Sequence, residues 1–82
     1  MHNITSVRFV EFLHIGKSVS TENNLHPGKN CGGERIVTLS VHDTIFMCVE
    51  LTSNGGQTTY KQFIPWAQVG TCFFDDAPTA KS

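Results

Sequence analysis

The sequence predicts a small all-β protein, a five-stranded antiparallel barrel or sandwich with a long loop after its first strand. In the middle of the chain, apolar and polar residues alternate with the period of two that is typical of half-buried strands. Clusters of Gly, Pro, Asn and Asp separate these stretches and indicate turns. The 82 residues leave room for a single hydrophobic core. We therefore expect residues 1–75 to form one β domain and residues 76–82 to form a flexible C-terminal tail.

The first expected strand covers residues 4–15, which are rich in Val, Ile and Phe. Its apolar residues fall on both faces: Val7, Phe9, Leu13 and Ile15 on one, Val10 and Phe12 on the other. Because side chains of a regular strand alternate strictly, a bend or bulge near Glu11 is expected.

Residues 16–34 should form the long loop, because their Asn, Pro and Gly pairs oppose regular structure. A connection of this length in a small domain is often functional. Its candidate binding residues are Lys17, His26 and Lys29.

Two strands follow over residues 35–41 and 45–51. Their apolar residues share one face only if an odd number of residues connects them, so a three-residue turn should place Val41 opposite Ile45. The next connection contains Asn54-Gly55-Gly56, which favours a two-residue turn and therefore pairs odd with even positions. The fourth strand should end at Pro65, followed by a short turn over 66–68 and a last strand over 69–74.

These registers predict both a core and an apolar surface. The expected core consists of Val37, Leu39, Val41, Ile45, Met47, Val49, Leu51, Tyr60 and Ile64. On the opposite face they place Phe46, Cys48 and Phe63, with Ile36 nearby; we call Phe46, Cys48 and Phe63 the outer row. Two interpretations remain open: the outer row is an interface, or the first strand or the loop covers it.

The stretch Phe63-Ile64-Pro65-Trp66-Ala67-Gln68-Val69 resembles the segment of SH3-like small barrels in which the fourth strand runs into one turn of 3₁₀-helix. Sm-like barrels share a similar plan. The resemblance implies that the loop over 16–34 corresponds to the RT loop of that family. The chain lacks the family's Ala-Leu-Tyr-Asp-Tyr segment and paired tryptophans, and Gln68 replaces a tyrosine, so proline-rich peptide binding is not implied.

No catalytic or cofactor-binding motif is present, and we expect neither an enzyme nor a cofactor. The spacing of Cys31, Cys48 and Cys72 favours free thiols over disulfides. The histidines and cysteines lack the spacing of a metal site, so no bound metal is expected. The N-terminus has no secretory signal and no long apolar stretch, which predicts a cytoplasmic protein that does not bind membranes.

The leading hypothesis is a non-enzymatic protein-binding module, an adaptor or inhibitor, for which a phage-encoded accessory protein is one setting that fits. Its candidate binding residues are Phe46, Phe63 and Trp66, together with the loop residues Lys17, His26 and Lys29. Trp66 is either a binding anchor or a plug at the barrel end. A homodimer through the outer row is expected as the simplest association.

The alternative is a nucleic-acid-binding barrel of the Sm or OB type. It would stack bases on Phe46, Phe63 and Trp66 and bind phosphates with Lys17, Lys29, Arg35 and Lys61. A net charge of −1 with scattered cations makes nucleic acid the weaker prediction.

Overall fold

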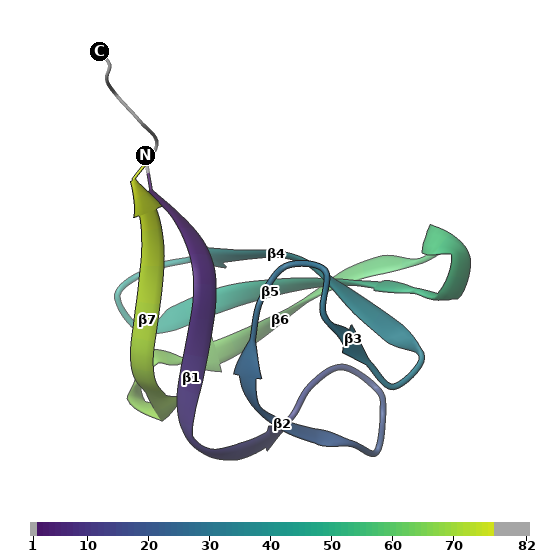
Figure 1. Cartoon of the computed structure of the whole chain (residues 1–82), viewed down its shortest axis with the longest axis horizontal. Helices are drawn as coiled ribbons and strands as arrows, with labels where there is room; N and C mark the ends of the chain where they lie inside the picture. The colour runs from purple at the N-terminus through teal and green to yellow at the C-terminus, as the bar shows by residue number, and fades with distance from the viewer. Residues whose placement is uncertain (1, 77–82) are drawn as a thin grey trace.

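Seven strands form two antiparallel sheets in the computed structural model, which describes residues 2–76 (Figure 1). The strands are β1 His2–His14, β2 Thr21–Leu25, β3 Asn30–Cys31, β4 Glu34–Val41, β5 Phe46–Ser53, β6 Thr59–Pro65 and β7 Val69–Asp76. Single 3₁₀ turns, η1 Asn54–Gly56 and η2 Trp66–Gln68, follow β5 and β6. The first sheet has the order β2-β1-β7 and the second β3-β4-β5-β6. The all-β prediction is confirmed; the expected tail lies beyond Asp76, outside the described residues.

The two strands beyond the predicted five lie within residues 16–34, which were expected to be a loop. β2 pairs with β1, and β3 pairs with the start of β4. Between them, the N–H of Gly28 donates to the carbonyl of Ile36, and the N–H of Ile36 donates to the carbonyl of Lys29. The segment also buries Leu25 and Cys31. Backbone pairing with existing strand edges thus orders a segment whose local composition opposes strands.

The predicted bend in β1 is confirmed. The pairing of β1 with β2 changes register between Arg8 and Leu13. Residues 9–12 of β1 therefore face the single residue 23 of β2. Phe9 is buried on one side of the bend, whereas Val10 and Phe12 are 65% and 63% exposed.

The core lies between the inner faces of the two sheets. It contains residues of both: Ile4, Val7, Phe9, Ile15, Leu25, Cys31, Ile36, Leu39, Met47, Val49, Leu51 and Ile64. Leu39, Met47, Val49, Leu51 and Ile64 are buried as predicted, and Tyr60 is half-buried against them. The sequence prediction omitted the contribution of β1 and of the long connection.

Three predicted core residues are wrong. A bulge between Ile36 and Thr38 shifts the register of β4, so Ile36 turns inward at 1% exposure and Val37 turns outward. Val41 lies opposite Met47, two residues beyond the predicted partner, and is 53% exposed. Ile45 belongs to the connection and is 61% exposed. The predicted parity of this hairpin is right, but its connection is longer than three residues.

The second hairpin has the predicted pairing and a different turn. Tyr60 lies opposite Leu51, and Phe63 lies opposite Cys48, as the even connection requires. The predicted two-residue turn is wrong, because the connection closes with the N–H of Ser53 donating to the carbonyl of Thr58. Gly55 and Gly56 both have positive φ inside it, a conformation that suits glycine.

Candidate functional site

The outer row occupies the face of β5 and β6 that points away from the core. Phe63 is 45% exposed, Phe46 is half-buried, and Cys48 is buried between its neighbours. The imidazole of His42 packs on Phe63, with 4.5 Å between the ring centroids. β1, β2 and β7 contribute to the core on the inner side of the second sheet, and within the outer row Phe63 is the exposed member. Figure 1 shows the two sheets whose inner faces enclose this core. Ile36, expected beside the row, lies in the core instead.

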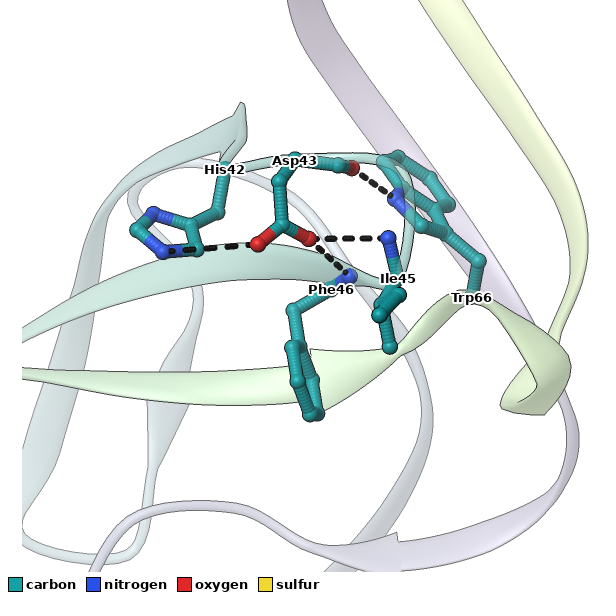
Figure 2. A network of polar contacts seen from close by, with 5 residues as sticks. All are labelled: His42, Asp43, Ile45, Phe46 and Trp66. Carbon is teal, nitrogen blue, oxygen red and sulfur yellow. Dashed lines mark hydrogen bonds and ion pairs between the residues drawn. The ribbon is translucent and has the colours of Figure 1, made fainter.

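Asp43 organises the turn that precedes Phe46 (Figure 2). Its Oδ1 accepts hydrogen bonds from the backbone N–H groups of Ile45 and Phe46, each 2.8 Å long. The hydrogen bond from Phe46 is the largest cause of a lowered pKa of the Asp43 carboxyl, and the bond from Ile45 is the next. Both bonds favour the ionised form of the carboxyl. Its Oδ2 lies 3.8 Å from Nε2 of His42. The Asp43 side chain therefore holds the end of this turn that leads into β5.

Trp66, the first residue of η2, is attached to the same turn (Figure 2). Its indole Nε1 donates to the carbonyl oxygen of Asp43 at 2.8 Å, and its backbone N–H donates to the carbonyl of Ile45 at 2.8 Å. The ring packs partly buried against the core. Trp66 thus joins η2 to the β4–β5 turn.

The candidate residues of the long connection lie at the other end of β4. Nζ of Lys29 is 3.0 Å from Oε1 of Glu22 and donates to the carbonyl of Asn24 at 2.7 Å. Nδ1 of His26 lies 3.0 Å from the carbonyl oxygen of Pro27. β3 pairs near Arg35, whereas the outer row aligns with Ser40, so the structure does not unite these residues with the outer row.

Lys17 belongs to a cluster that sequence reasoning missed, centred on Glu34. The Glu34 carboxylate accepts from the backbone N–H of Lys17 at 2.8 Å and from the hydroxyl of Tyr60. Nζ of Lys17 lies 4.8 Å from the centroid of the Tyr60 ring. A Cβ at Gly16, where φ is +73°, would collide with Oε1 of Glu34. Gly16 was the sequence signal of this close approach between the backbone and Glu34, because glycine has no Cβ.

Gln62 completes the attachment of the end of β1 to the second sheet. Its Oε1 accepts from the backbone N–H of Gly16 at 2.7 Å, and its Nε2 donates to the carbonyl of His14 at 3.1 Å. Together, Glu34 and Gln62 hold the start of the long connection against β6.

Tyr60 is the single tyrosine of the chain, so its titration can be observed directly. Burial, followed by the hydrogen bond to Glu34 and its negative charge, raises the pKa of Tyr60 to about 12. We expect tyrosinate absorbance to appear near pH 12 in the native protein and near the ordinary value of about 10 in the unfolded protein. Because the unfolded chain loses this proton first, stability should fall as the pH rises from about 10 towards 12.

Glu34→Gln is the matched variant for this titration. Removing the charge should lower the Tyr60 midpoint part of the way towards the unfolded value, because the larger effect of burial remains. An unchanged midpoint in a folded variant would contradict the Glu34–Tyr60 contact.

A polar hollow of about 360 Å³ lies at the far end of the second sheet, between the β3–β4 and β5–β6 turns. Its lining consists of the two glycines of each turn together with five polar or charged residues: Gly32, Gly33, Gly55 and Gly56, and Asn30, Glu34, Arg35, Thr52 and Ser53. The paired glycines were the only sequence signal of this hollow.

The cysteines lie apart as free thiols, Cys31 and Cys48 buried and Cys72 half-buried. Burial is the main cause that raises the pKa of the Cys31 and Cys72 thiols, which disfavours the reactive thiolate. Residues 2–76 contain no group of three or more His, Cys, Asp or Glu side chains placed to hold a metal ion. Within the same residues, no helix is long and apolar enough to cross a membrane.

No family model, curated protein or solved structure matches the chain. The argument for its function therefore depends on the arrangement of its own residues.

Proposed function

We propose that this chain is a non-enzymatic protein-binding module that docks a partner through the outer row. The observation that carries the proposal is the uncovered position of Phe63, 45% exposed beside the ring of His42. Aromatic side chains held on a rigid scaffold bury much area at little entropic cost, which is why they are common in protein interfaces. The Asp43 bonds to the turn supply this rigidity next to Phe46.

We further propose that the architecture is an SH3-like small barrel. Its five strands would be β1, β4, β5, β6 and β7, with β2 and β3 inside the counterpart of the RT loop. Three features support this assignment: β1 pairs with β7, β4-β5-β6 form a meander, and η2 follows Pro65. In this proposal, Trp66 acts mainly as the plug that closes the barrel end, because its indole N–H is already bonded to Asp43.

A protein fits the outer row better than nucleic acid does. The closest cation along β6, Lys61, lies opposite Glu50, and Lys29 is paired with Glu22. Arg35 borders the polar hollow at the other end of the sheet. A base-stacking surface gains much of its affinity from cations that neutralise phosphates, and these cations do not surround the outer row.

Phe63→Glu should reduce capture of the partner from extracts of the source cell at least tenfold, because a carboxylate would have to be desolvated in the interface. The measurement is quantitative mass spectrometry of proteins retained by the immobilised chain. Phe12→Glu is the matched control, since Phe12 is an exposed phenylalanine of the first sheet.

Circular dichroism and thermal unfolding should show both variants folded. Equal capture by the wild type and Phe63→Glu would refute the outer row as the docking surface. Salt-sensitive binding of single-stranded oligonucleotides, lost in Phe63→Glu, would instead support the nucleic-acid alternative.

A further inference from the structure

We propose that the polar hollow at the end of the second sheet binds the phosphate group of a small molecule, with the guanidinium of Arg35 as its main recognition group. The hollow, about 360 Å³ in volume, lies between the β3–β4 turn and η1, which are at the same end of the sheet (Figure 1). The outer row aligns with Ser40, near the other end of β4. The inference is therefore independent of the proposed function.

The volume and the lining of the hollow suit a small polar ligand. Pockets that hold small molecules have volumes of about 300 to 1,000 Å³, so this hollow has room for a phosphate group attached to a compact body. Among the residues that the structure describes, only glycines and polar or charged side chains line it. Hydrogen bonds and charge, rather than apolar burial, must therefore recognise its ligand.

Arg35 is the cation of the hollow, and its side chain is not engaged elsewhere in the protein. It is exposed and forms no ion pair, hydrogen bond or ring contact within the described part of the chain. By contrast, Nζ of Lys17 lies over the Tyr60 ring and Nζ of Lys29 lies beside Glu22. A guanidinium carries five N–H donors in a planar fork that matches two oxygens of a phosphate group.

Asn30 supplies further donors on the same face of the sheet. Arg35 lies opposite Asn30 of β3 and opposite Thr52 of β5, and directly opposite residues share a face. The amide group of Asn30 can donate two hydrogen bonds, and none of them is made to another described residue. The Thr52 hydroxyl donates to the carbonyl of Thr58, so it is already satisfied. Donors from two neighbouring strands are thus free to meet one ligand.

The carboxylates near the hollow do not cancel the charge of Arg35. Glu34 also lines the hollow, but its carboxylate accepts from the Tyr60 hydroxyl and from a backbone N–H of the long connection. Because Glu34 precedes Arg35 in β4, the two side chains point to opposite faces of the sheet. Glu50, the next acidic residue on the Arg35 face, lies opposite Lys61. The free charge at the hollow is therefore positive, and its complement is an anion.

A phosphate group fits these donors better than a carboxylate does. The two oxygens of a carboxylate are both used by a single guanidinium fork, which would leave the Asn30 amide unmatched. A phosphate monoester has three acceptor oxygens and a charge of about −1.5 to −2 near neutral pH. It can accept from Arg35 and Asn30 at the same time.

The test is a titration of the full chain with inorganic phosphate at constant ionic strength, followed by amide NMR spectra. We expect saturable shifts at the amides of the four lining glycines, and weaker binding of acetate. Arg35→Gln should raise the phosphate dissociation constant at least tenfold, because it removes a charge-assisted hydrogen bond. Lys61→Gln is the matched control: it removes the same charge from the same sheet outside the hollow, and screening should keep its effect within about twofold.

Asn30→Asp is a second, independent variant. It places a carboxylate beside Arg35 and should also weaken phosphate binding at least tenfold, because the new charge repels the anion and pairs with the guanidinium. Circular dichroism should show all three variants folded. A wild type without saturable shifts overturns the proposal. So does unchanged affinity in Arg35→Gln or Asn30→Asp, an equal loss in Lys61→Gln, or tighter binding of acetate than of phosphate.

Discussion

Ile36→Ala should destabilise the folded state by about 2–5 kcal/mol, the usual cost of removing a fully buried isoleucine side chain. Ile36 is 1% exposed in the core because the bulge in β4 turns it inward. The neighbouring Val37→Ala should cost less than about 1 kcal/mol, since Val37 faces solvent and loses mainly strand propensity. Denaturant unfolding of both variants, followed by the single tryptophan, measures the difference.

This pair of variants separates two registers of β4. Strict alternation along residues 35–41 predicts the opposite result, with Val37 in the core and Ile36 outside. A larger loss for Val37→Ala, or equal losses, would contradict the bulge. In both variants, the free energy of unfolding should depend on denaturant concentration with the same slope as in the wild type. Neither substitution substantially changes the surface that is exposed on unfolding.

Trp66→Ala should be the second most costly change, at about 2–4 kcal/mol, somewhat below a fully buried tryptophan because the ring is only partly buried. The variant removes the packing of the ring on the core and the hydrogen bond to the Asp43 carbonyl. Trp66→Phe retains much of the ring and should lose about 1 kcal/mol, which is the typical net contribution of one hydrogen bond. Thermal unfolding monitored by far-ultraviolet circular dichroism measures both variants.

The comparison also decides how Trp66 variants are used in binding experiments. A loss of partner capture in Trp66→Ala would reflect the loosened β4–β5 turn, whose residues His42 and Phe46 border the outer row. Trp66→Phe keeps that turn in place. If both variants unfold at the wild-type temperature, the indole contributes nothing to stability and its assignment as a plug is wrong.

The candidate site could be predicted only in part. The parity of the two hairpins placed Phe46 and Phe63 on the face opposite the core, and the structure has them there. The attachment of His42 to Phe63 and the bond from Trp66 to Asp43 were not predictable, because each joins residues that approach only after the sheet forms. The same holds for Glu34 and Tyr60, which are 26 positions apart.

Local physical chemistry was sufficient for the all-β class, for the faces of β1 and for the parity of both hairpins. Strand residues alternate between two faces with a strict period, so even a single sequence determines which side chains lie together once a strand is assumed. The bend in β1 was expected from the same rule, because the apolar residues of this strand lie at both odd and even positions, and a regular strand cannot place all of them on one face.

Tertiary structure alone decided the bulge at Val37, the lengths of both turns and the formation of two strands within residues 16–34. The bulge gives up one position of regular pairing between β4 and β5, and it buries Ile36. Burying Ile36 is favourable only because the inner faces of the two sheets enclose a core. Composition made residues 21–25 and 30–31 poor strand formers. They became β2 and β3 because β1 and β4 offered unpaired backbone groups, and because Leu25 and Cys31 could enter a core that the opposite sheet completes.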